Sequence, residues 1–342
     1  TVQGKPVFVN YARKEDFDTL KRMGVNVTGH ICIAKYGKIF RGNQLLNAYE
    51  EGAKGIIFYS DPQEVAPLGI EAYTVYPNTE FLPSTGIQRG SVYLGSGDPL
   101  TPSWPSINGA YRILSDKADL PKIPSQPIGY GDALYILMLL GGKPVPVEWS
   151  GVFTNLNVGP GFYSSELAEY IQLEVHNSLK LHNVKNVIGK IRGQIEPDRY
   201  VIVGNHRDAW GFGASDPSSG TAQLLETVRI LGNHKQQGWR PKRSILFASW
   251  GAEEYGIIGS QEWVEEMGTT IAAQGVALVN TDTCVSGPDL QLSASPSLYD
   301  MAIRALTKAK ANPNTVSGNE GRRRRFETWS IRAVHPVQCF QR

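Results

Sequence analysis

Strand patterns alternate with helical patterns in the second half of the chain, and this alternation restricts the fold more than any other feature. The strand-like runs are Tyr200–Val203, Arg243–Trp250 and Gly275–Asn280. The helical patterns are Thr221–Leu231, Ser260–Met267 and Ser297–Ala311. Such alternation predicts an α/β fold, with a mostly parallel mixed sheet and helices on both of its faces.

Ionisable side chains follow each of the three strand-like runs. His206 comes after the first run, Glu253 and Glu254 come after the second, and Asp282 comes after the third. In sheets of this kind the functional crevice lies beyond the carboxyl ends of the strands. We therefore expect these side chains at one edge of one sheet.

The segment Gly204–Gly220, GNHRDAWGFGASDPSSG, carries the densest chemistry. The spacing His206-x-Asp208 puts both side chains on one face of an extended segment. His206 can then ligate a metal while the carboxylate of Asp208 orients the imidazole. Asp216 follows across a glycine-rich turn, which lets the chain fold back toward the same point.

Each of these residues also has a structural interpretation. A His-x-Asp pair at a strand end is more often structural, Glu253 and Glu254 could cap the next helix, and Asp282 could form a turn. Their joint placement favours a metal site. Zinc takes about four ligands and lowers the pKa of its water to about 7, and a carboxylate then passes the proton to the leaving amine. Two zinc ions about 3.5–4 Å apart can share a bridging carboxylate.

The first half of the chain predicts a second, smaller unit. Strand-like runs at Pro6–Tyr11, His30–Tyr36 and Gly55–Tyr59 are accompanied by a helical pattern at Gln44–Gly52. These elements make a small mixed α/β unit. A long stretch rich in proline and glycine, Asp61–Pro127, follows them.

Further elements connect the two units. Ile128–Leu140 has helical spacing and stops at a pair of glycines, as a helix C-terminus does. Gly151–Phe162 is expected as a linking strand and loop. Ile171–His176 and Val184–Arg192 are expected as antiparallel strands, and Glu196–Arg199 as a turn before the next strand.

Length and composition indicate a folded protein of about two domains. With 34 basic and 32 acidic residues the net charge is +2, which gives no reason to expect nucleic acid as a partner. The basic run Arg322–Arg325 is typical of a solvated surface. Cys32, Cys284 and Cys339 lack the paired spacing of a structural zinc site. The longest apolar run, Ala133–Leu140, is shorter than the roughly 20 residues that a bilayer requires.

A resemblance to a known family rests on three segments, which read GNHRDAWGFGASDPSSG, FASWGAEEYGIIGSQEW and ALVNTDT. They closely resemble the co-catalytic zinc exopeptidases of the glutamate carboxypeptidase II family. That family includes the N-acetylated alpha-linked acidic dipeptidases, their aminopeptidase-like relatives and the transferrin receptors. The resemblance extends from near Pro6 to about Trp329 and implies a centre of two zinc ions.

The resemblance implies a metal role for the residues at the expected sheet edge. His206 and Asp282 would bind one zinc ion and Glu254 would bind the other. Asp216 would bridge the two ions.

The resemblance also implies catalytic and substrate roles. Glu253 would be the general base for a metal-activated hydroxide, and Asp208 would support His206. Arg41, in the sequence FRGN, matches an arginine that holds the terminal carboxylate of the substrate, a short peptide. Without the resemblance, Arg41 would be interpreted as a solvated loop residue.

The resemblance implies the following domain organisation. Residues 1–170 would form the protease-associated, or apical, domain, which the family inserts into its peptidase domain. Residues 171–329 would form the zinc peptidase domain, and residues 330–342 a tail unrelated to the family.

A structural calcium ion is implied between the two domains. Thr101, Trp104, Glu262 and Glu265 match the positions that hold it in the family. From the sequence alone, Glu262 and Glu265 are acidic residues on the surface of a helix.

The resemblance implies a homodimer and an extracellular location, as the ectodomain of a single-pass membrane protein. The triplet Asn26-Val27-Thr28 is a glycosylation sequon and permits passage through the secretory pathway.

Two positions depart from the acid-specific members of the family. Ser91 stands where they carry an asparagine in the glutamate pocket, and Leu292 stands where they carry an arginine that supports acidic side chains. These departures favour a broader, aminopeptidase-like or dipeptidase specificity.

The resemblance ends at Phe326–Trp329, and the family's second-zinc histidine and dimerising helical domain lie further downstream. We therefore expect a fragment with partial metal loading and little hydrolysis. His335 is a poor substitute ligand, because AVHPVQC does not match the family and Pro336 favours an extended loop. The alternative to a peptidase is a non-catalytic, receptor-like ectodomain of the transferrin receptor type.

Overall fold

The computed structural model describes residues 1–285 and 292–308. The chain divides into two compact units, Thr1–Asp282 and Thr283–Arg342. Several expectations from the sequence lie outside the described residues: the basic run Arg322–Arg325, the segment Phe326–Trp329, Cys339, and the tail 330–342 with His335.

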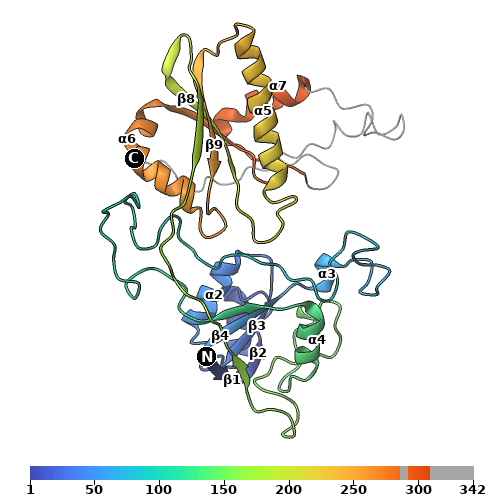
Figure 1. Cartoon of the computed structure of the whole chain (residues 1–342). Coiled ribbons are helices and arrows are strands. Elements are labelled where there is room, and N and C mark those ends of the chain that lie inside the picture. Colours follow the sequence, from blue (N-terminus) through green and yellow to red (C-terminus); the bar gives the residue numbers. More distant parts are fainter. Residues whose placement is uncertain (286–291, 309–342) are drawn as a thin grey trace. The chain divides into compact units, whose positions relative to one another are not determined.

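A four-stranded parallel sheet forms the centre of the first part of the chain (Figure 1). Its order is β2-β3-β4-β5, with β2 at Pro6–Phe8, β3 at Ile31–Lys35, β4 at Gly55–Tyr59 and β5 at Ser125–Pro127. Every residue of β2, β3 and β4 is buried. This explains why the strands have continuous apolar runs in the sequence and no alternation, as is usual for strands covered on both faces.

Helices α1 to α4 accompany this sheet, at Lys14–Arg22, Arg41–Glu50, Pro62–Val65 and Tyr130–Met138. The short 3-10 helix η1 spans Val147–Trp149. Helices α2 and α4 match the expected ones, with small shifts at the ends. Helix α1 was not expected, because its only buried apolar residues are Phe17 and Leu20. It begins with a reciprocal cap between Arg13 and Asp16, and the Asp16 carboxylate accepts hydrogen bonds from the Arg13 backbone and guanidinium.

The hydrophobic core around this parallel sheet is the first core of the chain. It is accompanied by a buried ion pair. The Lys35 Nζ and Asp61 Oδ2 atoms are 2.7 Å apart, and the two side chains are 3% and 2% exposed. The Lys35 ammonium also lies 5.4 Å from the centre of the Tyr11 ring. Each charge is therefore sheltered from water and compensated chiefly by the other.

The two strands expected in the connecting region are both antiparallel, but they pair with different partners. Strand β6, Ile171–Leu173, pairs with β1, Val2–Gly4, in a separate two-stranded sheet. Leu173 belongs to the first core, which explains this pairing. Strand β7, Val187–Ile191, pairs with β9 in the second sheet.

The second sheet has the order β10-β8-β9-β7. Strands β8, Glu196–His206, β9, Arg243–Trp250, and β10, Gly275–Asn280, are parallel, and β7 is the antiparallel edge. The expected turn at Glu196–Arg199 is wrong, because these residues are the start of β8. Glu196 pairs with Arg243 in the ladder, and the register shifts between Glu196 and Tyr200, where Pro197 lacks an N–H to donate.

Helices α5, Ser218–Gln236, and α6, Ile258–Gln274, pack on opposite faces of this sheet (Figure 1). On one face Ile202, Leu246, Ala248 and Trp250 pack with Trp263 and Ile271 of α6. On the other face Ile191 and Phe247 pack with Leu224 and Leu231 of α5. Neighbouring strand residues point to opposite faces, so the central strands β8 and β9 carry apolar residues on both faces, and a helix covers them on each side. The expected mostly parallel sheet between two helical layers is confirmed.

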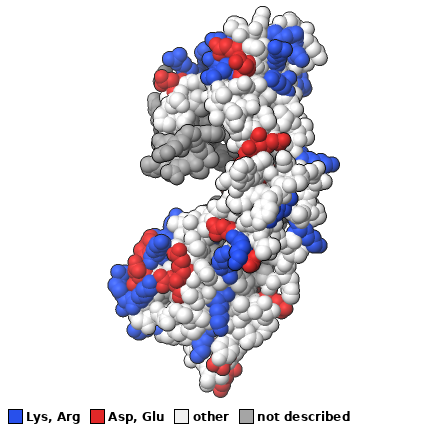
Figure 2. Space-filling model, turned by 90° about the vertical axis from the view of Figure 1, so that its left-hand side faces the viewer, with Lys and Arg blue, Asp and Glu red and all other residues white. Residues whose placement is uncertain are grey.

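The second unit contains η2, Pro296–Leu298, and α7, Tyr299–Lys308. Its helix agrees with the expected Ser297–Ala311, although the last expected residues lie beyond those described. In the described parts of the chain, each helix is too short or too polar to cross a bilayer. On the face shown in Figure 2, basic and acidic described side chains lie beside one another, as the small net charge suggests.

Removing one member of the buried ion pair should destabilise the first core. Lys35→Met leaves the Asp61 carboxylate buried without its cation, and we expect the free energy of unfolding to fall by about 3–5 kcal/mol. The control is Lys14→Met, since the Lys14 side chain is 78% exposed and lies 3.9 Å from Glu50. That variant should change the free energy by less than about 0.5 kcal/mol. Equal losses in urea denaturation would contradict this account.

Candidate metal centre

The carboxyl ends of β8, β9 and β10 lie side by side, and each leads into a segment with ionisable side chains. His206 is the last residue of β8 and is paired in register with Trp250 of β9. Glu253 and Glu254 follow β9, and Asp282 follows β10 by two residues. The sheet therefore brings together groups from three separate stretches of the sequence.

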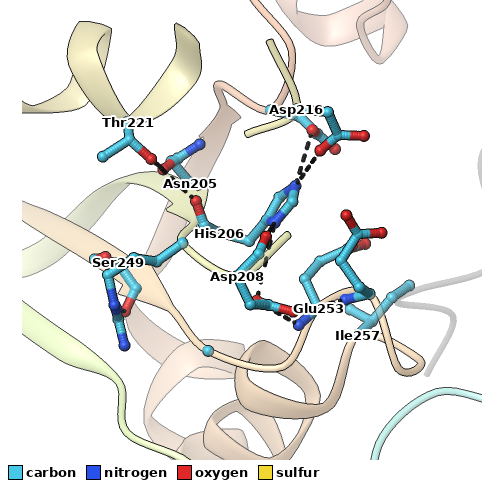
Figure 3. Close-up of polar contacts among 12 residues, drawn as sticks. Asn205, His206, Asp208, Asp216, Thr221, Ser249, Glu253 and Ile257 are labelled. Atoms are coloured by element: carbon cyan, nitrogen blue, oxygen red, sulfur yellow. Dashed lines mark hydrogen bonds and ion pairs between the residues drawn. The ribbon is translucent and has the colours of Figure 1, made fainter. Parts of the chain in front are cut away.

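Two carboxylates converge on one nitrogen of the His206 imidazole (Figure 3). The Nε2 atom lies 3.0 Å from Asp282 Oδ1 and 3.1 Å from Asp216 Oδ1. The imidazole is only 3% exposed, whereas the Asp216 and Asp282 side chains are 57% and 44% exposed. Ligand atoms of His206, Asp216 and Glu254 all lie within 4.8 Å of one another. The arrangement is open to solvent on the carboxylate side and closed on the imidazole side.

Asp208 does not contact the imidazole in the expected way. The His206 Nδ1 atom lies 3.0 Å from the main-chain oxygen of Asp208 and 3.9 Å from its carboxylate. The carboxylate instead accepts hydrogen bonds from the backbone N–H groups of Glu253, at 2.9 Å, and Glu254, at 3.1 Å. Asp208 therefore orients the imidazole through its carbonyl and holds the Glu253–Glu254 backbone through its side chain.

The electrostatics of the cluster reflect a surplus of carboxylates. Burial lowers the pKa of His206, but the hydrogen bond and charge of Asp282 and the charge of Glu253 outweigh it and raise the pKa to about 9. Burial raises the pKa of Glu253 and of Glu254, and the charge of Asp216 raises both further. The carboxylates repel one another, and a bound cation would relieve that repulsion.

The donor set fits zinc. Zinc sites in proteins combine imidazole nitrogen with carboxylate oxygen at about 2.0–2.2 Å, so a cation between Nε2 and the two aspartates would need only small side-chain movements. The second imidazole nitrogen is occupied by a main-chain carbonyl, which leaves Nε2 as the ligand atom.

The centre is supported by three residues without a metal role, Asn205, Thr221 and Gly220, and the sequence interpretation missed them. The fully buried Asn205 donates to the Thr281 carbonyl at 2.9 Å and accepts from the Thr221 hydroxyl at 2.6 Å. A Cβ atom on Gly220 would lie 1.6 Å from the Thr281 oxygen and 2.0 Å from the Asp282 oxygen. Only glycine lets helix α5 approach the segment that carries Asp282. The available signal was the position of Gly220 at the end of GNHRDAWGFGASDPSSG.

Comparison with known families assigns both parts of the chain. Residues 186–326 match Peptidase family M28, and residues 2–93 match the PA domain. The chain joins a PA domain to an M28 peptidase domain.

Curated relatives agree with this assignment. The Glutamate carboxypeptidase 2 homolog of Caenorhabditis briggsae is 40% identical over 338 residues, which cover 96% of this chain and 43% of that protein. Aminopeptidase NAALADL1 of Mus musculus is 41% identical, with 91% of this chain and 43% of that protein covered. The Probable glutamate carboxypeptidase LAMP1 of Arabidopsis thaliana is 42% identical, covering 92% and 44%. The chain thus spans less than half the length of these relatives, all of which are named as peptidases. Their names give no support to the receptor-like alternative.

Among solved structures, a zinc aminopeptidase from Bacillus subtilis aligns over 90% of this chain and 57% of that chain. The TM-score is 0.42 and the sequence identity is 18%.

The residues expected to hold calcium are only partly assembled. Glu262 of the M28 domain accepts hydrogen bonds from the backbone of Asp98 and Ser106, which ties the 98–106 segment to α6. The Thr101 hydroxyl and Glu265 Oε2 are buried oxygens without a hydrogen-bond partner among the described residues. Trp104 is 73% exposed. Orphaned buried oxygens fit a hard cation, which takes oxygen ligands.

Arg41 and Ser91 lie together in the PA domain part of the chain. Arg41 is the first residue of α2, and its Nε donates to the Ser91 carbonyl at 2.7 Å. Its guanidinium carbon lies 5.1 Å from the Phe40 ring centre. A Cβ atom on Gly90 would overlap the guanidinium. Arg41 is thus held in one orientation by its neighbours.

Leu292, the other position that departs from the acid-specific pattern, lies in the second unit.

A methyl group at position 220 should disturb the metal centre. Gly220→Ala would push the Thr281–Asp282 backbone away from His206, and we expect weaker zinc binding and a stability loss of about 1–3 kcal/mol. The control is Gly232→Ala in the same helix, where an added Cβ would have no atom within 4 Å. It should leave zinc affinity unchanged and gain up to about 1 kcal/mol. Competition with a chromophoric chelator measures the affinity, and equal affinities in both variants would contradict the role of Gly220.

Proposed function

We propose that the protein is a zinc-dependent exopeptidase that hydrolyses short peptides with Glu253 as the general base. The observation that carries the proposal is the convergence of Asp216 and Asp282 on His206 Nε2, with Glu254 in the same group. Membership of peptidase family M28 supports it. The activity belongs to the whole protein, since this chain spans less than half the length of its relatives.

The zinc ligands in this proposal come in two sets. His206 and Asp282 would hold one ion, Glu254 would hold a second, and Asp216 would serve as a ligand to both. The side-chain atoms of His206, Asp216 and Glu254 are close enough to share this task. Bound zinc would supply Lewis-acid activation of water and of the scissile carbonyl.

In this proposal Glu253 accepts a proton from the attacking water. Its backbone N–H and that of Glu254 are fixed by one carboxylate, so the neighbouring side chains leave the same rigid loop. Water adds to the scissile carbonyl carbon as Glu253 accepts its proton. Glu253 then delivers that proton to the amine nitrogen as the C–N bond breaks, which is ordinary general base and general acid catalysis.

We propose that Arg41 binds the terminal carboxylate of the peptide. Its Nε is committed to the Ser91 carbonyl, and the rest of the guanidinium fork can face a carboxylate. With Ser91 and Leu292 at the two departing positions, the side-chain specificity should extend beyond acidic residues.

We propose a structural calcium ion at Thr101, Trp104, Glu262 and Glu265. The two orphaned oxygens, on Thr101 and Glu265, support the proposal, because burying oxygen atoms without a partner is unfavourable.

We also propose that the protein is an extracellular homodimer that carries a glycan on Asn26. Asn26 is exposed, and its side chain accepts a hydrogen bond from the Thr28 backbone at 2.9 Å within the sequon. Mass spectrometry of the secreted protein before and after glycosidase treatment tests the glycan.

Replacing the general base should abolish turnover and spare metal binding. In the full-length protein we expect Glu253→Gln to lower peptide hydrolysis by about 10²–10⁴-fold, because an amide cannot accept the proton of water. Zinc content should stay unchanged. Glu266→Gln, on the exposed surface of α6, is the matched control and should retain full activity. Unchanged hydrolysis in the Glu253 variant would overturn the assignment.

A further inference from the structure

The loop that carries Glu253 and Glu254 has an unfavourable backbone conformation. Ala252 and Ile257 adopt left-handed φ angles of 54° and 57°. For a β-branched residue such as Ile257 this is a genuine outlier. Such conformations persist only where the surroundings impose them, and they cluster at functional sites.

The two ends of this loop are drawn together. The Gly259 N–H donates to the Gly251 carbonyl at 3.0 Å, and the Ile258 N–H donates to the Ala252 carbonyl at 3.0 Å. The loop therefore closes on itself between the end of β9 and the first turn of α6. Glu253 and Glu254 therefore lie in a loop whose two ends are hydrogen-bonded to each other.

One side chain outside the loop bridges both of its ends. The Asn186 Oδ1 accepts from the Gly251 N–H at 3.1 Å, and the Asn186 Nδ2 donates to the Gly259 carbonyl at 2.7 Å. A backbone N–H can only donate and a carbonyl can only accept, so the orientation of the amide is fixed. Asn186 thus satisfies one donor and one acceptor at the closure point.

Glycine is required at both ends for this approach. A Cβ on Gly259 would lie 2.5 Å from the Asn186 side-chain oxygen, and a Cβ on Gly251 would lie 2.9 Å from the Lys185 carbonyl. The segment with Asn186 consequently packs directly on loop backbone.

A second side chain holds that segment in place. Arg207, next to His206, donates through Nη2 to the Lys185 carbonyl at 2.8 Å. Through Nη1 it donates to the carbonyl and the hydroxyl of Ser249, at 3.0 and 2.8 Å. The end of β8, the end of β9 and the Lys185–Asn186 segment are therefore linked by one guanidinium.

We propose that Asn186 is a positioning residue of the metal centre. Its amide closes the loop Gly251–Gly259 from one side while the Asp208 carboxylate holds the loop's N–H groups from the other. Together they fix where the Glu254 carboxylate meets His206. The inference rests on the proposed function, because it assigns Glu254 to zinc.

Zinc affinity of the chain itself tests this role without any peptidase assay. We expect Asn186→Ala to weaken zinc binding by about 10–100-fold, the usual effect of removing a residue that orients a metal ligand. Asn186→Asp keeps the acceptor for Gly251 and loses the donor for Gly259, so it should give a smaller loss and serves as a milder variant. Each variant is measured under conditions where circular dichroism shows it to be folded.

The matched control is Asn47→Ala in the PA domain part. Asn47 is buried, and its Nδ2 donates to the Ala12 carbonyl at 2.9 Å. This variant loses a comparable hydrogen bond, so it should lower stability and leave zinc affinity unchanged.

Coupling to Glu254 separates positioning from general stabilisation. In a Glu254→Ala background, Asn186→Ala should change zinc affinity by less than about twofold, because the ligand it positions is gone. The inference is overturned if Asn186→Ala leaves affinity unchanged, if its effect persists without Glu254, or if the unsubstituted chain binds no zinc. Failure of Glu253→Gln to affect hydrolysis would refute the proposed function alone.

Discussion

The meeting of two aspartate carboxylates at one imidazole nitrogen is the interaction on which the M28 domain's chemistry depends. His206 Nε2 lies 3.0 Å from Asp282 and 3.1 Å from Asp216. Two negatively charged carboxylates that meet at one nitrogen repel each other, and the neighbouring glutamates add to that repulsion. The arrangement is therefore suited to a divalent cation.

The parallel sheet makes this meeting possible. The parallel strands β8, β9 and β10 end at one edge, so three loops distant in sequence share one small volume. Apolar packing on both faces fixes the strands. Close backbone approaches then set the loops, with Gly220 admitting the chain that carries Asp282 and Asn186 closing the loop that carries the glutamates. The metal ligands are few, but their placement depends on residues with no metal role.

Much of this could be predicted from the sequence, because continuous apolar runs and metal-binding motifs are local signals. The strands Arg243–Trp250 and Gly275–Asn280 have the expected bounds. The strand start at Glu196–Arg199 was mistaken for a turn, since a proline and polar residues mark turns and bulges alike. The role of Asn186 could not be predicted, and that of Gly220 was indicated only by its place in the motif, because their partners are backbone atoms brought close only by the tertiary fold. The role of the Asp208 carboxylate could not be predicted either, because it binds the backbone N–H groups of Glu253 and Glu254.

The most direct test is the position of the metal itself. Crystals of the zinc-loaded protein, measured at the zinc absorption edge, would give an anomalous difference map. The account predicts a peak about 2.0–2.1 Å from His206 Nε2, with a carboxylate oxygen of Asp216 also coordinated. No peak at His206, or peaks only at exposed histidines such as His176 and His234, would contradict it.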